Sequence, residues 1–199
     1  MAIQLPRPPR DLGEITFETY LQLPENRQRY DIIDGVMNMS PAPSDVHQWD
    51  LAHLYDLLKA HVAAGDLGVV LFAPLDLIIR KSPKLTTRQP DLAYFSWESI
   101  GGKGLEALKE ARRRGVAPAL SVEILSPDQS KAYMERKLRD YAEISIREVW
   151  LVSRETKTVE VLVLEGNEYV CSGVYDSGQN LVCKVLSGLE IGVDSIFEN

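Results

Sequence analysis

The 199-residue sequence has no long apolar run, few cysteines and more acidic than basic residues. No stretch approaches the roughly 18 consecutive apolar residues of a membrane-spanning helix. The N-terminal segment MAIQLPRPPR has no apolar centre, so it does not resemble a secretory signal. These absences predict a protein that works in the cytoplasm without a membrane partner.

Only two cysteines occur, Cys171 and Cys183, and neither belongs to a CxxC pair. The missing pairs argue against a structural zinc site, because such sites use closely spaced ligands. A disulfide between two neighbouring late strands is one alternative. Reduced, packed thiols are favoured, because a disulfide needs an oxidising compartment and the chain shows no secretion signal.

Basic residues are outnumbered, with 22 Lys and Arg against 29 Asp and Glu and a formal net charge of −7. This balance argues against a protein that coats nucleic acid, since affinity for phosphates comes largely from Lys and Arg. Three short basic clusters leave room for a local basic track, at residues 81–88, 112–114 and 136–139. The favoured interpretation of each cluster is a solvated surface.

Apolar periodicity predicts a mixed α/β domain with one central sheet, flanking helices and a β-rich C-terminal part. The expected helices cover residues 16–23, 47–62, 105–114 and 131–144. The expected strands cover residues 68–80, 89–96, 119–126 and 147–155. Hairpins are expected around the turn Asp34-Gly35 and around residues 165–167. Residues 1–15 are expected to form a mobile arm, and residues 16–199 a single domain.

Two carboxylates interrupt apolar strands: Glu123 in ALSVEILS and Asp91 in QPDLAYF. An ionised carboxylate that is buried alone costs several kcal/mol or becomes neutralised. If the two lie on adjacent strands and point the same way, a divalent cation between them would remove their repulsion. Hard oxygen ligands suit Mg²⁺ or Mn²⁺. The alternative stays open that each carboxylate lies at a strand end and is bound by backbone N–H groups or an arginine.

A cationic partner for Glu123 is missing from its own strand, where Leu125 occupies the next position on the same face. The following helix supplies one. At about 100° per residue, Tyr133, Lys137 and Tyr141 form one stripe of that helix, whereas Asp140 is assigned to the opposite side. Lys137 therefore projects from the core-facing arc, where it must meet an acid or a metal-bound water. Lys131 is less favoured because the start of a helix is more easily solvated.

Several motifs together resemble the Uma-two family of putative restriction endonucleases, a branch of the PD-(D/E)XK nuclease superfamily. In chain order they are RYDIIDGVMNMSPAPSDVHQ, APLDLIIR, QPDLAYF, SVEILSP and KLRDYAEISIREVWLV, and the resemblance spans residues 29–163. It implies a restriction-endonuclease-like core and a magnesium-dependent phosphodiesterase. It also implies that Asp91, Glu123 and the main-chain carbonyl of Ile124 bind the metal. Lys137 matches a lysine that this family carries on the helix after the (D/E)XK strand.

The chain departs from the family pattern at three positions. Asp31 stands where family members often carry glutamate, and Val36 stands where they carry an acid after the Asp-Gly turn. Tyr133 stands where they tend to have an aspartate, four residues before the helical lysine.

Four further residues are candidate accessory members of the site. His47 matches a histidine common in the family and is placed to orient a water or contact a phosphate; its alternative is a helix cap or a surface histidine. Asp34 lies in the hairpin turn, and Asp76 falls in an apolar strand. Gln89 is a candidate hydrogen-bond donor to the scissile phosphate, although packing or solvent contact is favoured.

The predicted function is hydrolysis of DNA phosphodiester bonds by a metal-dependent endonuclease, with Mg²⁺ or Mn²⁺ as cofactor. One alternative is a catalytically inactive nuclease-fold module that binds DNA or protein, which the acidic net charge favours. Another is a phosphodiesterase acting on RNA or branched nucleic acid. Cutting both strands of a duplex suits paired sites, so a homodimer is expected.

Overall fold

The structure is a computed structural model that describes residues 13–23, 29–127 and 129–198. Within these ranges six strands form the larger sheet, in the order β10-β9-β8-β7-β6-β3. Their bounds are β3 Gly68–Phe72, β6 Leu92–Ser96, β7 Leu120–Ile124, β8 Glu148–Ser153, β9 Thr158–Glu165 and β10 Glu168–Tyr175. Strands β7 and β8 are parallel, and the other neighbours are antiparallel. Helix α5 (Lys131–Glu143) is the crossover between β7 and β8.

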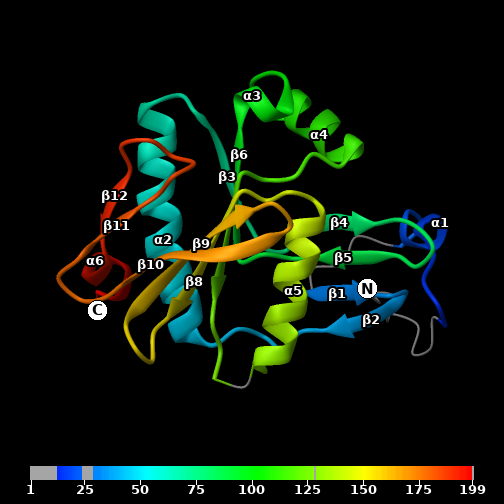
Figure 1. The fold of residues 1–199 in the computed structure, drawn as a ribbon. Coiled ribbons are helices and arrows are strands. Elements are labelled where there is room, and N and C mark those ends of the chain that lie inside the picture. The colour runs from blue at the N-terminus through cyan, green and yellow to red at the C-terminus, as the bar shows by residue number, and fades with distance from the viewer. Residues whose placement is uncertain (1–12, 24–28, 128, 199) are drawn as a thin grey trace, which may run out of the picture.

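A smaller sheet has the order β2-β1-β5-β4 and is antiparallel throughout. Its strands are β1 Tyr30–Ile33, β2 Val36–Met39, β4 Leu77–Arg80 and β5 Thr86–Arg88. Helix α5 contacts β10 of the large sheet and β4 of the small sheet, and Figure 1 shows it between the two. A third pair, β11 (Asn180–Val182) and β12 (Glu190–Gly192), lies near the C-terminus.

Helices cover both faces of the large sheet (Figure 1). Helix α2 (Asp45–Ala64) packs Leu54, Leu58 and Val62 against one face, together with α6 (Val193–Phe197). Helix α5 and helix α4 (Leu105–Arg114) pack against the other face. Short helices α1 (Phe17–Tyr20) and α3 (Trp97–Ile100) complete the described part of the chain. Ser44 caps α2, because its side chain accepts a hydrogen bond from the backbone N–H of His47 at 3.2 Å.

The expected mixed α/β class with flanking helices is confirmed, with two corrections. Residues 68–80 form β3 and β4 in different sheets rather than one strand, since Pro74 lies in the break between them. The strand expected at residues 89–96 is present but shorter, because β6 begins only at Leu92. The expected central sheet is therefore the six-stranded one, and the expectation missed the separate four-stranded sheet that forms one wall beside α5.

The N-terminal arm falls largely outside the described residues, which begin at Gly13. Ile15 is buried, and its N–H donates to the carbonyl of Gly35 at 2.7 Å. In the parts of the chain that the structure describes, no helix is long and apolar enough to cross a membrane.

The two cysteines are both free and differ in accessibility. Cys171 on β10 is exposed, so the expected packed thiol is found only at Cys183. Burial, reinforced by the nearby Glu148 carboxylate, raises the pKa of the Cys183 thiol. We expect one thiol equivalent to react rapidly in the native protein and two after denaturation, with Cys171→Ser abolishing the rapid phase. Two rapid equivalents in the native protein would contradict this assignment.

Candidate functional site

Asp91 and Glu123 lie across from each other where β6 and β7 pair. Leu92 pairs with Val122, so the preceding residue on β6 and the following residue on β7 face one another. The backbone N–H of Asp91 donates to the carbonyl of Val122 at 3.1 Å. Each of the two side chains is only 3% exposed. The structure therefore places two carboxylates in the protein interior, as close neighbours.

Lys137 of α5 reaches Glu123 from the face of the sheet that α5 covers. Its Nζ lies 2.6 Å from Glu123 Oε2 and also donates to the carbonyl of Gln89 at 3.0 Å. The Tyr141 hydroxyl, one helical turn later, donates to Glu123 Oε1 at 2.5 Å. Burial raises the pKa of Glu123, and the charge of Lys137 opposes that rise. The helical stripe of Lys137 and Tyr141 thus supplies both donors to this carboxylate.

Asp91 has a different set of partners. Arg29 Nη1 contacts Oδ1 at 2.5 Å, and the backbone N–H of Ile124 donates to Oδ2 at 2.7 Å. His47 Nε2 lies 3.4 Å from the same Oδ2. Burial alone would raise the pKa of Asp91, but hydrogen bonding from His47 and the charge of Arg29 lower it to about 2. Asp91 is therefore an anion that a backbone N–H group and an arginine already bind. This matches the alternative in which the carboxylate needs no metal ion to compensate its charge.

The donor chemistry of this site fits a hard divalent cation. In an extended strand the N–H and C=O of one residue point to the same side, and the Ile124 N–H points to Asp91. The Ile124 carbonyl is therefore directed toward the side of β7 on which Asp91 lies, and it is the third oxygen ligand that the family resemblance implies. Within the described ranges no group of three or more His, Cys, Asp or Glu side chains is placed to hold a metal ion. Water would have to complete a coordination sphere begun by Asp91, Glu123 and the carbonyl, as is common for Mg²⁺.

The accessory candidates divide into those near the acids and those away from them. His47 adjoins Asp91, whereas Asp34 is 45% exposed and pairs with Arg136 and Arg80. Gln89 participates through its carbonyl, which accepts from Lys137 at 3.0 Å and from Arg29 at 3.1 Å.

Asp76 acts on the site only indirectly. It accepts hydrogen bonds from the Gln89 side chain at 2.7 Å and from the hydroxyls of Tyr20 and Tyr30. The Gln89 amide is thus engaged by Asp76. Together the two residues fix the segment that carries the Gln89 carbonyl between Arg29 and Lys137.

A buried ion cluster behind the site was not predicted. Arg88 is fully buried, with Nη1 2.8 Å from Asp31 Oδ2 and Nε 2.7 Å from Asp140 Oδ2. Asp31 also accepts from the Tyr133 hydroxyl and from the backbone N–H of Gln89. The solvated interpretation of Arg88 and the outward assignment of Asp140 are both wrong. Helix α5 contacts two sheets, so its buried arc is wider than a single sheet requires.

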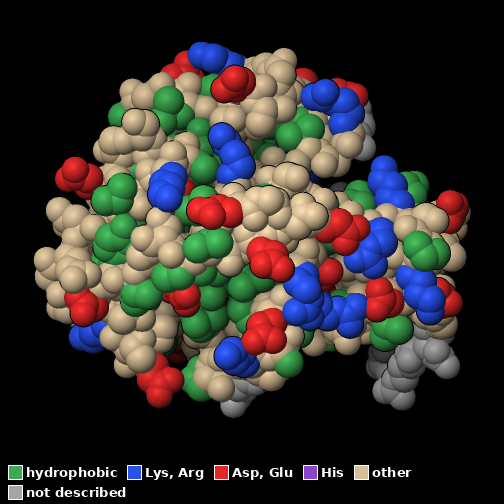
Figure 2. Space-filling model, viewed as in Figure 1, with side chains coloured by type: hydrophobic (Ala, Val, Ile, Leu, Met, Phe, Trp, Pro, Cys, Tyr) green, Lys and Arg blue, Asp and Glu red, His purple; other side chains and the backbone are tan. Residues whose placement is uncertain are grey.

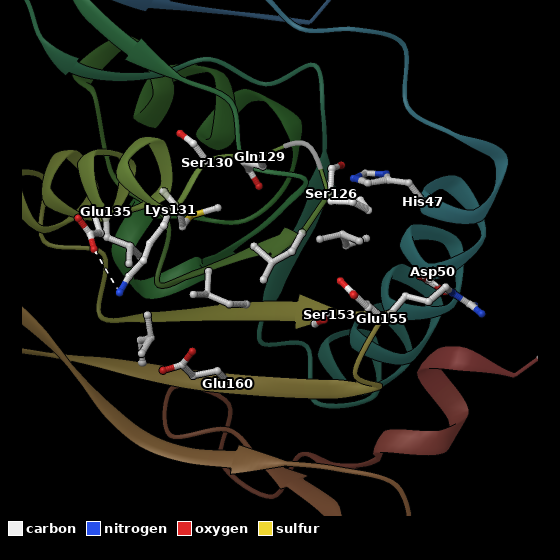
Figure 3. A pocket seen from close by; sticks show the side chains of 18 of the residues that line it. His47, Asp50, Ser126, Gln129, Ser130, Lys131, Glu135, Ser153, Glu155 and Glu160 are labelled. Carbon is white, nitrogen blue, oxygen red and sulfur yellow. Dashed lines mark hydrogen bonds and ion pairs between the residues drawn. The ribbon is translucent and has the colours of Figure 1, made fainter.

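A groove of about 820 Å³ begins beside the site and runs along α5 (Figure 3). His47 and Ile124 line one end, and Leu125, Met134 and Leu151 are among its apolar walls. Asp91, Glu123 and Lys137 are not among its lining residues. On the molecular face in Figure 2, acidic and basic side chains are interspersed rather than separated into fields of one sign.

Comparisons with known proteins agree with the observed fold. The family model of Uma2, described as "Putative restriction endonuclease", matches residues 17–194. A solved structure of a putative nuclease belonging to DUF820, from Anabaena variabilis ATCC 29413, is similar with a TM-score of 0.71 and 20% identity. The match covers 92% of this chain and 97% of that chain. No curated protein matches the chain. The fold is therefore the restriction-endonuclease-like fold expected from the motifs, and the chain belongs to the Uma2 family of putative restriction endonucleases.

Proposed function

We propose that this protein is a metal-dependent endonuclease that hydrolyses phosphodiester bonds of DNA, with Mg²⁺ or Mn²⁺ as cofactor. The observation that carries the proposal is the meeting of Asp91, Glu123 and Lys137 from three separate segments. All three side chains are almost fully buried, and each has polar partners that fix its position. Family membership supports a nuclease role for such a site.

In this proposal Asp91, Glu123 and the Ile124 carbonyl hold the cation, which supplies charge neutralisation and an activated water when bound. Lys137, which donates to Glu123, would orient the attacking water and stabilise charge that develops on the phosphate. Tyr141 and the Gln89 carbonyl fix the carboxylate and the ammonium group. His47, beside Asp91, is a candidate to receive a proton from water.

The metal requirement gives the direct test. We expect plasmid DNA to be nicked or linearised in the presence of Mg²⁺ or Mn²⁺ and to remain intact when EDTA is present, because the bound ion would supply the activated water and the positive charge that hydrolysis of a phosphodiester needs. Agarose gel electrophoresis of supercoiled plasmid measures both outcomes. Cleavage that persists at the same rate in EDTA would refute the proposed mechanism.

The competing proposal is a nuclease-fold module that binds DNA or protein without cutting it. The ion pair between Arg29 and Asp91 favours it, because the guanidinium already neutralises one of the two acids. Calorimetric titration with Mn²⁺ separates the two, since a binding module has no need of a metal at Asp91 and Glu123.

A panel of duplex DNA, single-stranded DNA, RNA and branched DNA identifies the substrate. Analytical ultracentrifugation tests the homodimer that double-strand cleavage would suit.

A further inference from the structure

Arg29 is the outermost of the four charges that pair at the site. Its side chain is 22% exposed, against 3% for Asp91 and 4% for Lys137. The guanidinium covers one carboxylate oxygen of Asp91 through Nη1 and the Gln89 carbonyl through Nη2. Of these charged groups, Arg29 is therefore the one with the most direct path to solvent.

The cluster is electrically balanced in the absence of a metal. Asp91 and Glu123 contribute two negative charges, and Arg29 and Lys137 contribute two positive charges at 2.5 and 2.6 Å from them. A divalent cation held by the two acids would add two positive charges to a buried, neutral cluster. Such a cation would lie close to both resident positive groups, and like charges at close range repel strongly in a protein interior. One resident cation must therefore leave Asp91 or Glu123 when a metal binds.

The structure favours Arg29 over Lys137 as the cation that moves. Lys137 lies in the middle of α5 and is enclosed, whereas Arg29 precedes β1 and is partly exposed. The backbone of Arg29 is anchored, since its carbonyl accepts from the N–H of Ser40 at 2.9 Å. Rotation of the side chain alone is thus enough to free Asp91.

The guanidinium also has unused binding capacity. Its Nε is buried and has no hydrogen-bond partner among the described residues. A planar guanidinium can donate two parallel hydrogen bonds to the oxygens of one phosphate. A phosphate beside the site would therefore give Nε, together with a terminal nitrogen, the partner that it lacks at present.

We propose that Arg29 is the resident counter-ion of Asp91 in the metal-free protein and becomes a ligand of the nucleic-acid phosphate when a divalent cation replaces it. This inference rests on the proposed function and adds to it a coupling between metal binding and nucleic-acid binding. Metal binding releases the arginine that the phosphate needs, and phosphate binding keeps that arginine away from Asp91. Metal and nucleic acid therefore bind more tightly together than separately.

Calorimetric titration with Mn²⁺ in the absence of nucleic acid tests whether Arg29 competes with the metal for Asp91. Arg29→Gln removes the competing charge and is expected to bind Mn²⁺ about tenfold more tightly than wild type, within the usual range of coupling between sites. Arg29→Lys keeps a charge and is expected to stay within about threefold of wild type. Lys59→Gln, an equal charge change on the exposed side of α2, is the matched control and is expected to leave the affinity unchanged. Thermal melting followed by circular dichroism verifies that each variant is folded.

The same titration is repeated with a saturating short DNA duplex whose phosphorothioate linkages resist hydrolysis. It tests whether nucleic acid strengthens Mn²⁺ binding through Arg29. In wild type the duplex is expected to tighten Mn²⁺ binding about tenfold, and in Arg29→Gln by less than about twofold. Arg29→Lys is expected to show a smaller duplex-induced gain in Mn²⁺ affinity than wild type, because lysine lacks the planar guanidinium that donates two parallel hydrogen bonds to a phosphate.

The outcomes separate the inference from the proposed function. If wild type binds Mn²⁺ and cuts DNA but Arg29→Gln has unchanged Mn²⁺ affinity, the inference is overturned and the proposed function stands. A full duplex-induced gain in Arg29→Gln overturns the inference in the same way. If wild type binds no Mn²⁺, both fail.

Discussion

Replacement of Lys137 by methionine is expected to slow plasmid cleavage by about a thousandfold, because loss of one preorganised donor at a reacting phosphate has effects of this order. Methionine matches the length and apolar stem of lysine but removes the ammonium group that lies 2.6 Å from Glu123 Oε2. Mn²⁺ binding is expected to persist, since the proposed ligands remain and the metal itself offsets the charge of Glu123. First-order nicking rates with excess enzyme, together with Mn²⁺ calorimetry, measure the two effects.

Two variants make this result specific. Lys131→Met removes a lysine from the same helix whose side chain is 91% exposed, and it is expected to change the rate less than about threefold. Asp91→Asn is expected to lose Mn²⁺ binding and cleavage together, because Asp91 is a proposed metal ligand. A Lys137→Met protein that is folded and cuts at the wild-type rate would show that the helical lysine has no catalytic role.

The position of Lys137 could be predicted from the sequence because the residues that contact one another there are close along the chain. Glu123 and Lys137 are 14 residues apart, on a strand and on the helix that follows it. A short connection folds such a helix back over its own strand, and helical periodicity then fixes the buried face. An ionised group in an apolar strand requires a partner there. These two constraints together identify Lys137 without knowledge of the remaining fold.

The partners of Asp91 and Arg88 could not be predicted from the sequence in the same way. Arg29 and Asp91 are 62 residues apart, and Arg88 and Asp140 are 52 apart. Such pairs depend on how the small sheet packs beside α5, which no local periodicity encodes. In a short segment, a buried arginine and a solvated arginine also have the same sequence signature. The one available signal was that Asp31 lies in a short strand between Tyr30 and Ile32, both of them apolar or aromatic.

Leu125 occupies the strand position at which a cationic partner for Glu123 is missing. This residue packs with the apolar cluster beneath α5 and lines the adjacent groove. The ammonium group reaches Glu123 from the helix instead, while Tyr141 binds the other carboxylate oxygen. A polar contact that one strand would supply is thus divided between two residues one helical turn apart.

Replacement of Arg88 by methionine is expected to lower the free energy of unfolding by about 3–5 kcal/mol, the usual cost of removing one partner from a buried ion cluster. Asp31 and Asp140 would remain in the interior, 3% and 6% exposed, without the guanidinium between them. The small sheet would then be held less firmly against α5. Urea denaturation at pH 7, followed by tryptophan fluorescence, measures the difference.

Comparison with a surface arginine distinguishes the buried charges from loss of packing or charge in general. Arg80 has a side chain that is 31% exposed, pairs with Glu143 at 2.7 Å and touches the cluster only at its edge, 3.9 Å from Asp140. Arg80→Met is therefore expected to cost less than about 1 kcal/mol. Adding Asp31→Asn and Asp140→Asn to Arg88→Met is expected to recover most of the lost stability, because no buried charge then lacks a partner. If Arg88→Met costs no more than Arg80→Met, the cluster does not hold the small sheet to α5. In that event the positions of Gln89 and its carbonyl, and hence of Lys137, must depend on Asp76 and on the apolar contacts of α5.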